Sequence, residues 1–281
     1  MTLTPYSATR ALLDRASRAF VVALTLGLSH LMAGAADQVF AWPNGARAAV
    51  SLAYDDALES QLEHAIPALD RYGLKATFYL TLASDTVLQR LDDWRRAARS
   101  GHEIGNHSLF HQCSRAGPER EWVPDHRNLD TTTAAQMRDQ VLLANTFLHA
   151  IDGARERTFT PPCGDLIASG ENYVDALRPA FVAFRVPGAA VVSEVQTVDP
   201  YRVGAVAYAD MTGQQLIAVV KQAAARGTMA HLTFHGVGAD YLAVTREAHD
   251  ELLQFLADNR AIYWTDTFIS IMKHVRARQA P

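Results

Sequence analysis

Short runs of apolar residues alternate along the chain with longer stretches in which apolar positions recur at helical spacing. The short runs are rich in β-branched and aromatic residues, which is typical of buried strands, and the longer stretches are typical of amphipathic helices. We expect strands at residues 48–54, 76–80, 102–104, 157–160, 181–186, 229–235 and 261–264. We expect helices at about residues 60–72, 85–100, 133–150, 213–226, 246–259 and 266–277.

Glycine residues support several of these boundaries. Gly73, Gly101 and Gly227 each follow a helical stretch directly, at the position where the backbone commonly turns left-handed. The alternation of strands and helices predicts an α/β fold with about seven parallel strands, arranged either as a doubly wound sheet or as a distorted (β/α) barrel. No low-complexity linker interrupts this alternation, so we expect a single folded domain.

The N-terminal segment has a different pattern. Arginine residues precede an apolar run at residues 19–36 that ends in small residues, which is the layout of a secretory signal peptide. An uncleaved membrane anchor is the alternative, and the run is at the short limit for a bilayer span. We therefore expect a signal peptide at residues 1–35 and a secreted or periplasmic catalytic domain at residues 36–281, with no stable membrane span after cleavage.

Composition and charge narrow the function. The chain is 49% hydrophobic and 20% charged, with a formal net charge of −4, so it has no electrostatic basis for binding nucleic acid. Cys113 and Cys163 are the only cysteines, too few for a disulfide framework. An oxidising compartment permits one bridge between them, and two separate buried thiols are equally compatible with their spacing.

Polar residues gather where the expected strands end. Ligands and catalytic groups lie at the carboxyl ends of parallel strands in both candidate architectures. The polar residues at or just after these ends are Asp55, Asp56, Asn106, His107, His111, Cys163, Arg185 and His235. We expect them to converge on one site.

The residue types at this site favour metal-assisted hydrolysis. Asp55 and Asp56 are adjacent, so their carboxylates point in different directions, and one can bind a cation while the other faces a water molecule. His107 and His111 are close enough on a tightly turned segment to share one ion. Two histidines and one carboxylate leave coordination positions open, as a catalytic divalent metal requires. A structural zinc site closed by a cysteine is the alternative.

A second histidine pair has the same spacing. His231 and His235 lie on an expected strand, where four residues span about 13 Å, so they cannot bind one ion together. His235 is at the carboxyl end of that strand and His231 is near its start. We therefore interpret His235 as functional and His231 as structural.

These motifs resemble those of the polysaccharide deacetylase family, also called the NodB-homology or carbohydrate esterase 4 group, over about residues 42–281. Residues 53–57 (Ala-Tyr-Asp-Asp-Ala) resemble its first motif, residues 107–111 (His-Ser-Leu-Phe-His) its second and residues 232–235 (Leu-Thr-Phe-His) its fifth. The resemblance implies a NodB-like distorted (β/α) barrel.

The resemblance also implies roles for individual residues. Asp56, His107 and His111 would bind a divalent metal ion, with zinc expected. Asp55 would be the catalytic base and His235 the general acid.

The third motif departs from the family pattern. Residues 160–164 read Thr-Pro-Pro-Cys-Gly where the family has Arg-x-Pro-Tyr-Gly. The backbone N–H of Cys163 can still donate a hydrogen bond to an oxyanion. Arg185 is the candidate to replace the missing arginine beside Asp55. The fourth motif is not recognisable, and its nearest candidate, Asp199, precedes a proline in a pattern that favours a turn.

The activity that the resemblance implies is hydrolysis of acetyl groups from N- or O-acetylated sugars of a polysaccharide such as chitin, peptidoglycan or xylan. An acetylated carbohydrate is therefore the expected partner. One alternative keeps the fold and metal but acts on small cyclic amides or imides, and the presence of Asp55 argues against it. The other is a catalytically weak carbohydrate-binding protein, which the altered third motif favours.

Overall fold

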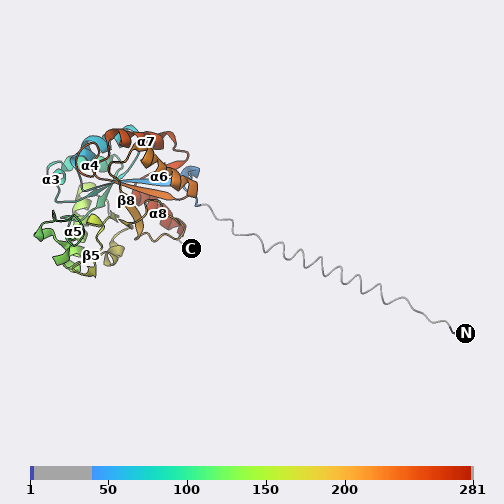
Figure 1. The fold of residues 1–281 in the computed structure, drawn as a ribbon, viewed down its shortest axis with the longest axis horizontal. Helices are drawn as coiled ribbons and strands as arrows, with labels where there is room; N and C mark the ends of the chain where they lie inside the picture. The colour runs from blue at the N-terminus through green and yellow to red at the C-terminus, as the bar shows by residue number, and fades with distance from the viewer. Residues whose placement is uncertain (3–39, 280–281) are drawn as a thin grey trace. The chain divides into compact units, whose positions relative to one another are not determined.

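Parallel strands surrounded by helices make up most of residues 40–279 (Figure 1). The structure, a computed structural model, describes residues 1–2 and 40–279. The main sheet contains β1 (Ala48–Asp55), β2 (Thr77–Leu80), β3 (Glu103–Asn106), β4 (Thr158–Phe159), β7 (Ala183–Pro187), β8 (Val203–Ala207), β9 (Met229–Phe234) and β10 (Tyr263–Thr265). The α-helices are α2 (Ile66–Arg71), α3 (Asp85–Gln89), α4 (Leu91–Arg99), α5 (Ala134–Asp152), α6 (Gly213–Arg226), α7 (Arg246–Asp258) and α8 (Phe268–Gln279). A small antiparallel pair, β5 (Ile167–Ala168) and β6 (Glu171–Asn172), follows β4.

The main sheet closes on itself. Seven strands pair in the order β1-β2-β3-β4-β7-β8-β9, and β9 returns to β1 over residues 49–54. Every pair in this ring is parallel. The eighth strand, β10, pairs only with the first half of β1, whereas β2 pairs with its last residues. The closed ring confirms the distorted (β/α) barrel and excludes the doubly wound sheet.

One strand of the ring was missed from the sequence. Residues 203–207 (Val-Gly-Ala-Val-Ala) form β8, and the expected strand at 261–264 is β10, outside the ring. A run of glycine and alanine gives a weak strand signal because it has little side chain to bury. The glycine is nevertheless required, since a Cβ on Gly204 would come 2.6 Å from the carbonyl oxygen of Ala189.

The helices follow the expected pattern with two interruptions. The expected helix at 60–72 begins as a π-helix at Gln61–Ala65 before α2, and the one at 85–100 is divided into α3 and α4 at Arg90. The backbone is left-handed at Gly73, Gly101 and Gly227, with φ of 60°, 94° and 67°. The three glycines therefore end their helices as predicted.

Helix α8 lies against the amino ends of β2 and β3. The N–H of Phe268 donates to Thr77 Oγ1, and the N–H of Ile269 donates to Glu103 Oε2 at 2.9 Å. Burial raises the pKa of Glu103, while hydrogen bonds from neighbouring hydroxyls oppose that rise. Apolar residues of α8 pack with Ala49 and Tyr79. These contacts cover the amino end of the barrel and leave the carboxyl ends of the strands available for a site.

The expected signal peptide at residues 1–35 lies outside the described residues. Within residues 40–279, no helix combines the length and the apolar character that a membrane span needs.

Candidate active site

The turn after β1 separates two buried aspartates. β1 ends at Asp55, and the backbone is left-handed at Asp56 and Ala57, with φ of 79° and 59°. The side chain of Asp55 contacts Arg185, whereas that of Asp56 faces His107 and His111. The two carboxylates therefore point to different partners, as adjacent residues at a strand end are expected to do.

Asp56, His107 and His111 form a three-residue cluster. Asp56 Oδ1 lies 3.1 Å from His107 Nε2 and 3.0 Å from His111 Nε2, and the ligand atoms all lie within 4.8 Å of one another. The Nδ1 atom of His107 lies 2.7 Å from the carbonyl oxygen of Thr160 and donates to it. This bond leaves the lone pair of Nε2 directed at the cluster, the arrangement that metal-binding histidines commonly have.

The cluster fits a divalent cation. Asp56 Oδ1 is buried and accepts no hydrogen bond within the described part of the chain, which is costly for a carboxylate oxygen unless a cation compensates. Nitrogen and oxygen ligands lie about 2.0–2.2 Å from zinc, so two of them on one tetrahedral ion are separated by roughly 3.4 Å. The separations of 3.1 and 3.0 Å are a few tenths of an ångström shorter, so a small outward shift of the side chains would admit the ion.

The electrostatics of the cluster favour an ionised aspartate. Burial opposes ionisation of Asp56, but the contacts with His107 and His111 hold its pKa well below the usual range. Burial also opposes protonation of His107, yet the neighbouring aspartates raise its pKa overall. A proton and a metal cation therefore compete for the imidazole of His107.

Asp55 is held by an arginine from another strand. Arg185 Nη1 donates to Asp55 Oδ1 at 3.0 Å, and Nη2 donates to Thr233 Oγ1. The guanidinium is buried and lies 4.7 Å from the centre of the Tyr79 ring. Burial opposes the charge on Arg185, but Asp55 and Tyr79 outweigh this effect and raise its pKa. The carboxylate of Asp55, next to the cluster of Asp56, His107 and His111, therefore has a fixed, charged partner.

His235 joins the cluster from the end of β9. Its Nε2 atom lies 3.6 Å from Asp56 Oδ2. His231, four residues earlier, does not line the site cavity, and burial lowers its pKa to about 3. The two members of this pair therefore occupy different environments.

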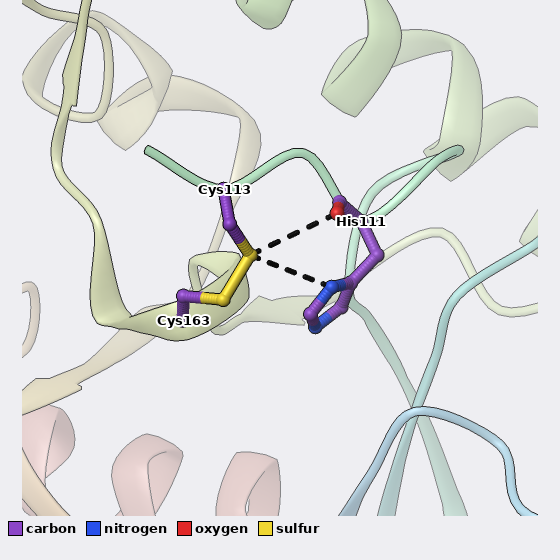
Figure 2. A group of neighbouring side chains, drawn as sticks. All are labelled: His111, Cys113 and Cys163. Atoms are coloured by element: carbon purple, nitrogen blue, oxygen red, sulfur yellow. Dashed lines mark hydrogen bonds between the residues drawn. A yellow bond between two sulfur atoms is a disulfide. The ribbon is translucent and has the colours of Figure 1, made fainter. Parts of the chain in front are cut away.

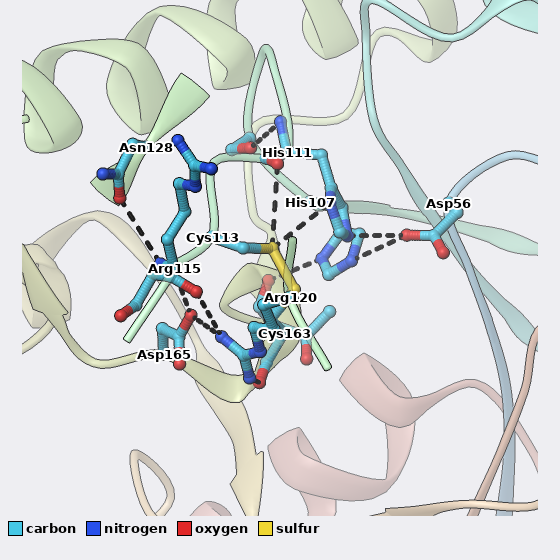
Figure 3. The surroundings of a disulfide bond; sticks show 12 residues. Asp56, His107, His111, Cys113, Arg115, Arg120, Asn128, Cys163 and Asp165 are labelled. Carbon is cyan, nitrogen blue, oxygen red and sulfur yellow. Dashed lines mark hydrogen bonds and ion pairs between the residues drawn. A yellow bond between two sulfur atoms is a disulfide. The ribbon is translucent and has the colours of Figure 1, made fainter. Parts of the chain in front are cut away.

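A disulfide joins Cys113 to Cys163, with Cα atoms 5.8 Å apart. The Sγ atom of Cys113 lies 3.6 Å from His111 Nδ1 (Figure 2). The bridge ties the loop that carries His111 to the loop that carries Cys163, and both imidazoles of the cluster point from this region toward Asp56 (Figure 3). It settles the open question about the two cysteines, and it removes them as metal ligands in the oxidised protein.

Two residues that contact the site, Tyr241 and Gln61, were not assigned a role from the sequence. The hydroxyl of Tyr241 donates to Asp56 Oδ2 at 2.8 Å, although its side chain is 53% exposed. The side-chain amide of Gln61 donates to the backbone carbonyls of Asp55 and His235. Tyr241 lies in an irregular loop and Gln61 in a π-helix, so no periodic pattern marks either residue as part of the site.

Seven of the eight residues that were expected to converge on one site line a cavity of about 760 Å³. It is lined by Asp55, Asp56, His107, His111, Cys163, Arg185 and His235, among others. Asn106 does not line this cavity, and its side-chain amide donates to the carbonyl oxygen of Val141. Asp199 is not among the lining residues: it accepts from the N–H of Tyr201 two positions later, which is the predicted turn.

The family model for polysaccharide deacetylases matches residues 38–179, half of the chain. The chain therefore belongs to the polysaccharide deacetylase family, a family of metal-dependent deacetylases that also includes a pseudoenzyme, and its closed barrel is the fold of that family. Among curated proteins, it is 30% identical over 103 residues to the uncharacterized protein YlxY of Bacillus subtilis. The match covers 37% of this chain and 27% of YlxY.

Solved structures of the same fold include three informative relatives. A polysaccharide deacetylase from Mycobacterium smegmatis, described as putative, aligns with a TM-score of 0.57 and 16% identity, covering 86% of this chain and 94% of its own. The peptidoglycan deacetylase PdaC of Bacillus subtilis aligns with a TM-score of 0.50 and 20% identity, and the alignment covers 82% of this chain and 92% of PdaC. A family 4 acetyl xylan esterase of Clostridium thermocellum, solved with cobalt, aligns with a TM-score of 0.50 and 22% identity, and the alignment covers 83% of this chain and 92% of the esterase. The fold also occurs in a protein described as a pseudoenzyme of this family, so fold alone does not establish activity.

Proposed function

We propose that this protein is a metal-dependent hydrolase that removes acetyl groups from N- or O-acetylated sugars of a polysaccharide. The observation that carries the proposal is the convergence of Asp56, His107 and His111 in one cavity with a buried, arginine-held Asp55. These are the parts that hydrolysis of an acyl group requires: a metal site with open positions, a base and a proton donor.

Asp56, His107 and His111 would hold the divalent metal ion, with zinc the expected ion. When bound, such an ion lowers the pKa of a coordinated water and polarises a carbonyl group. The hydroxyl of Tyr241 donates to Asp56 Oδ2, and the other carboxylate oxygen, Oδ1, faces the histidines. The sulfur atoms of Cys113 and Cys163 are joined in a disulfide and are not available as a fourth ligand, which favours a catalytic metal site over a structural one.

Asp55 would remove a proton from the attacking water. Arg185 fixes the orientation of this carboxylate, the function that the third-motif arginine has in the family pattern. Thr160, at the position of that arginine, contributes its carbonyl oxygen to His107 instead.

Cys163 and His235 would complete the reaction. The backbone N–H of Cys163 would donate to the oxyanion that forms when water adds to the acetyl carbonyl. His235 would then donate a proton to the departing amine or hydroxyl, which releases acetate and a deacetylated sugar.

The same observations weigh against the two alternatives. Asp55 is present and held by a buried partner, which a relative acting on cyclic amides without this base would not need. A binding protein without turnover would not need the base, the acid and the metal ligands in one cavity. The names of the relatives favour peptidoglycan and acetylated xylan as substrates to test. Export, as the N-terminal pattern predicts, would bring the protein to such polymers.

The test is acetate release by the metal-loaded protein from N-acetylglucosamine oligomers, peptidoglycan and acetylated xylan. We expect acetate from at least one substrate, and its loss after chelation with recovery on adding zinc. A metal-loaded protein that releases acetate from none of them but opens cyclic imides would replace this proposal with the first alternative.

A further inference from the structure

The site cavity has one apolar wall, on the side of β7 and β8. Its side chains are those of Pro187, Ala205 and Ala207, with Trp122 and Leu242 at the cavity as well. Trp122 is 60% exposed and Leu242 is 54% exposed. The aspartates and histidines of the site follow other strands, namely β1, β3 and β9. Exposed apolar side chains gathered beside a cavity mark a surface that binds an apolar group.

The apolar wall begins beside Cys163. Gly164 has a left-handed backbone, with φ of 71°, and a Cβ there would lie 2.4 Å from Pro187 Cγ. The loop that carries Cys163 is therefore packed directly against Pro187. A carbonyl oxygen that accepts from the N–H of Cys163 would place the acyl carbon chain next to this wall.

The wall continues along small side chains. Pro187 is paired with Ala205 in the sheet, and Ala207 follows two residues later on the same face of β8. Neither alanine extends beyond its Cβ, so the wall leaves space where larger residues would fill it. A cavity of about 760 Å³ lies in the size range that encloses a drug-sized ligand, so it has room for an acyl chain beside a sugar residue.

We propose that the site accepts acyl groups longer than acetyl, with their carbon chain along Pro187, Ala205 and Ala207. The inference rests on the proposed function, because the same metal site, base and acid would cleave the longer group. Water adds to the carbonyl carbon and the bond from that carbon to the sugar nitrogen or oxygen breaks. The products are the carboxylic acid of the chain and a free amine or hydroxyl, and no other reactant is needed.

The test is the rate of hydrolysis of nitrophenyl esters from acetyl to hexanoyl by the metal-loaded full chain. Each buried methylene changes an affinity by about fourfold, so we expect kcat/KM to rise from acetyl to hexanoyl. Ala205→Leu fills the wall and should lower the hexanoyl-to-acetyl ratio about tenfold. Val206→Leu is the matched control, because Val206 is the next residue of β8 and does not line the cavity. A hexanoyl-to-acetyl ratio below one in the wild type, or the same ratio in Ala205→Leu as in Val206→Leu, would overturn the inference.

A binding measurement separates this inference from the proposed function. Acetohydroxamate and hexanohydroxamate carry the two acyl chains on a metal-binding group and need no turnover. We expect metal-loaded Asp55→Asn protein to bind the hexanoyl compound at least about tenfold more tightly in calorimetry. This result would support the acyl pocket even if no acetylated sugar were hydrolysed, and equal binding of both compounds would overturn it.

Discussion

At the scale of single residues, the most informative contact is the one between Arg185 and Asp55. The family motif that normally supplies an arginine lacks one here, yet a buried guanidinium lies 3.0 Å from the Asp55 carboxylate. The arginine comes from β7 instead of the loop after β4. Its position at a strand end made it predictable from sequence, because strand ends converge in any parallel barrel. Its contact with Asp55 was the one that the sequence favoured, whereas its second hydrogen bond, to Thr233, depends on side-chain geometry that a sequence does not show.

The contact predicts the effect of a conservative substitution. Arg185→Lys keeps the charge but cannot reach both Asp55 and Thr233 in a fixed plane. We expect kcat to fall about ten- to a hundredfold, with metal content unchanged. Steady-state kinetics and metal analysis of the same preparation test this. Wild-type kcat in the variant would show that Arg185 does not position the base.

Tyr241 makes a second residue-scale contact that sequence patterns did not reveal. Its hydroxyl holds the Asp56 oxygen that faces away from the histidines. Groups that orient a metal ligand typically contribute about ten- to a hundredfold to metal affinity, so we expect Tyr241→Phe to weaken zinc binding by about tenfold. Competition with a chromophoric chelator measures this, with Tyr208→Phe as a control outside the cavity. Equal zinc affinity in both variants would rule out this role.

At the scale of elements, the sequence predicted the helices and most strands because their apolar positions recur with a clear period. β8 was missed because glycine and alanine bury little surface, and β10 was placed in the ring because its pattern cannot show which strand it pairs with. The convergence of the candidate metal ligands was predictable for a related reason. They lie in short motifs at strand ends, whereas Tyr241 and Gln61 reach the site from segments without such a pattern.

The disulfide joins the loop that carries His111 to the loop that carries Cys163. Its removal should affect both stability and metal binding. A bridge across a sequence separation of 50 stabilises the fold by about 4 kcal/mol in the chain-entropy treatment. We expect the Cys113→Ser, Cys163→Ser double variant to unfold at lower denaturant concentration and to bind zinc more weakly, because His111 loses a fixed neighbour. Chemical denaturation and zinc titration test this, and an unchanged zinc affinity would confine the bridge to a stabilising role.

At the scale of the whole molecule, buried histidines make stability depend on pH. Burial lowers the pKa of His231 and of His249 to about 3, while the unfolded chain has a histidine pKa near 6.5. Between these values the unfolded state binds protons that the folded state does not. The stability that these residues contribute is therefore complete above about pH 6.5 and is lost as the pH falls toward 3.

Denaturant unfolding near pH 7 and near pH 5 tests this dependence. Each histidine should reduce the free energy of unfolding by up to about 1.4 kcal/mol per pH unit below pH 6.5. His249 accepts a hydrogen bond from Tyr54 at 2.6 Å only while its Nε2 is unprotonated, which adds to the effect. A free energy of unfolding that stays constant between the two pH values would contradict it.

The central claim is that Asp55 is the base beside a metal held by Asp56, His107 and His111. The most direct measurement is acetate release by Asp55→Asn protein whose zinc content is determined in the same sample. The account predicts one equivalent of zinc and a rate reduced by at least about a thousandfold. Full zinc occupancy with acetate release near the wild-type rate would contradict it, because hydrolysis would then proceed without the Asp55 carboxylate as the base.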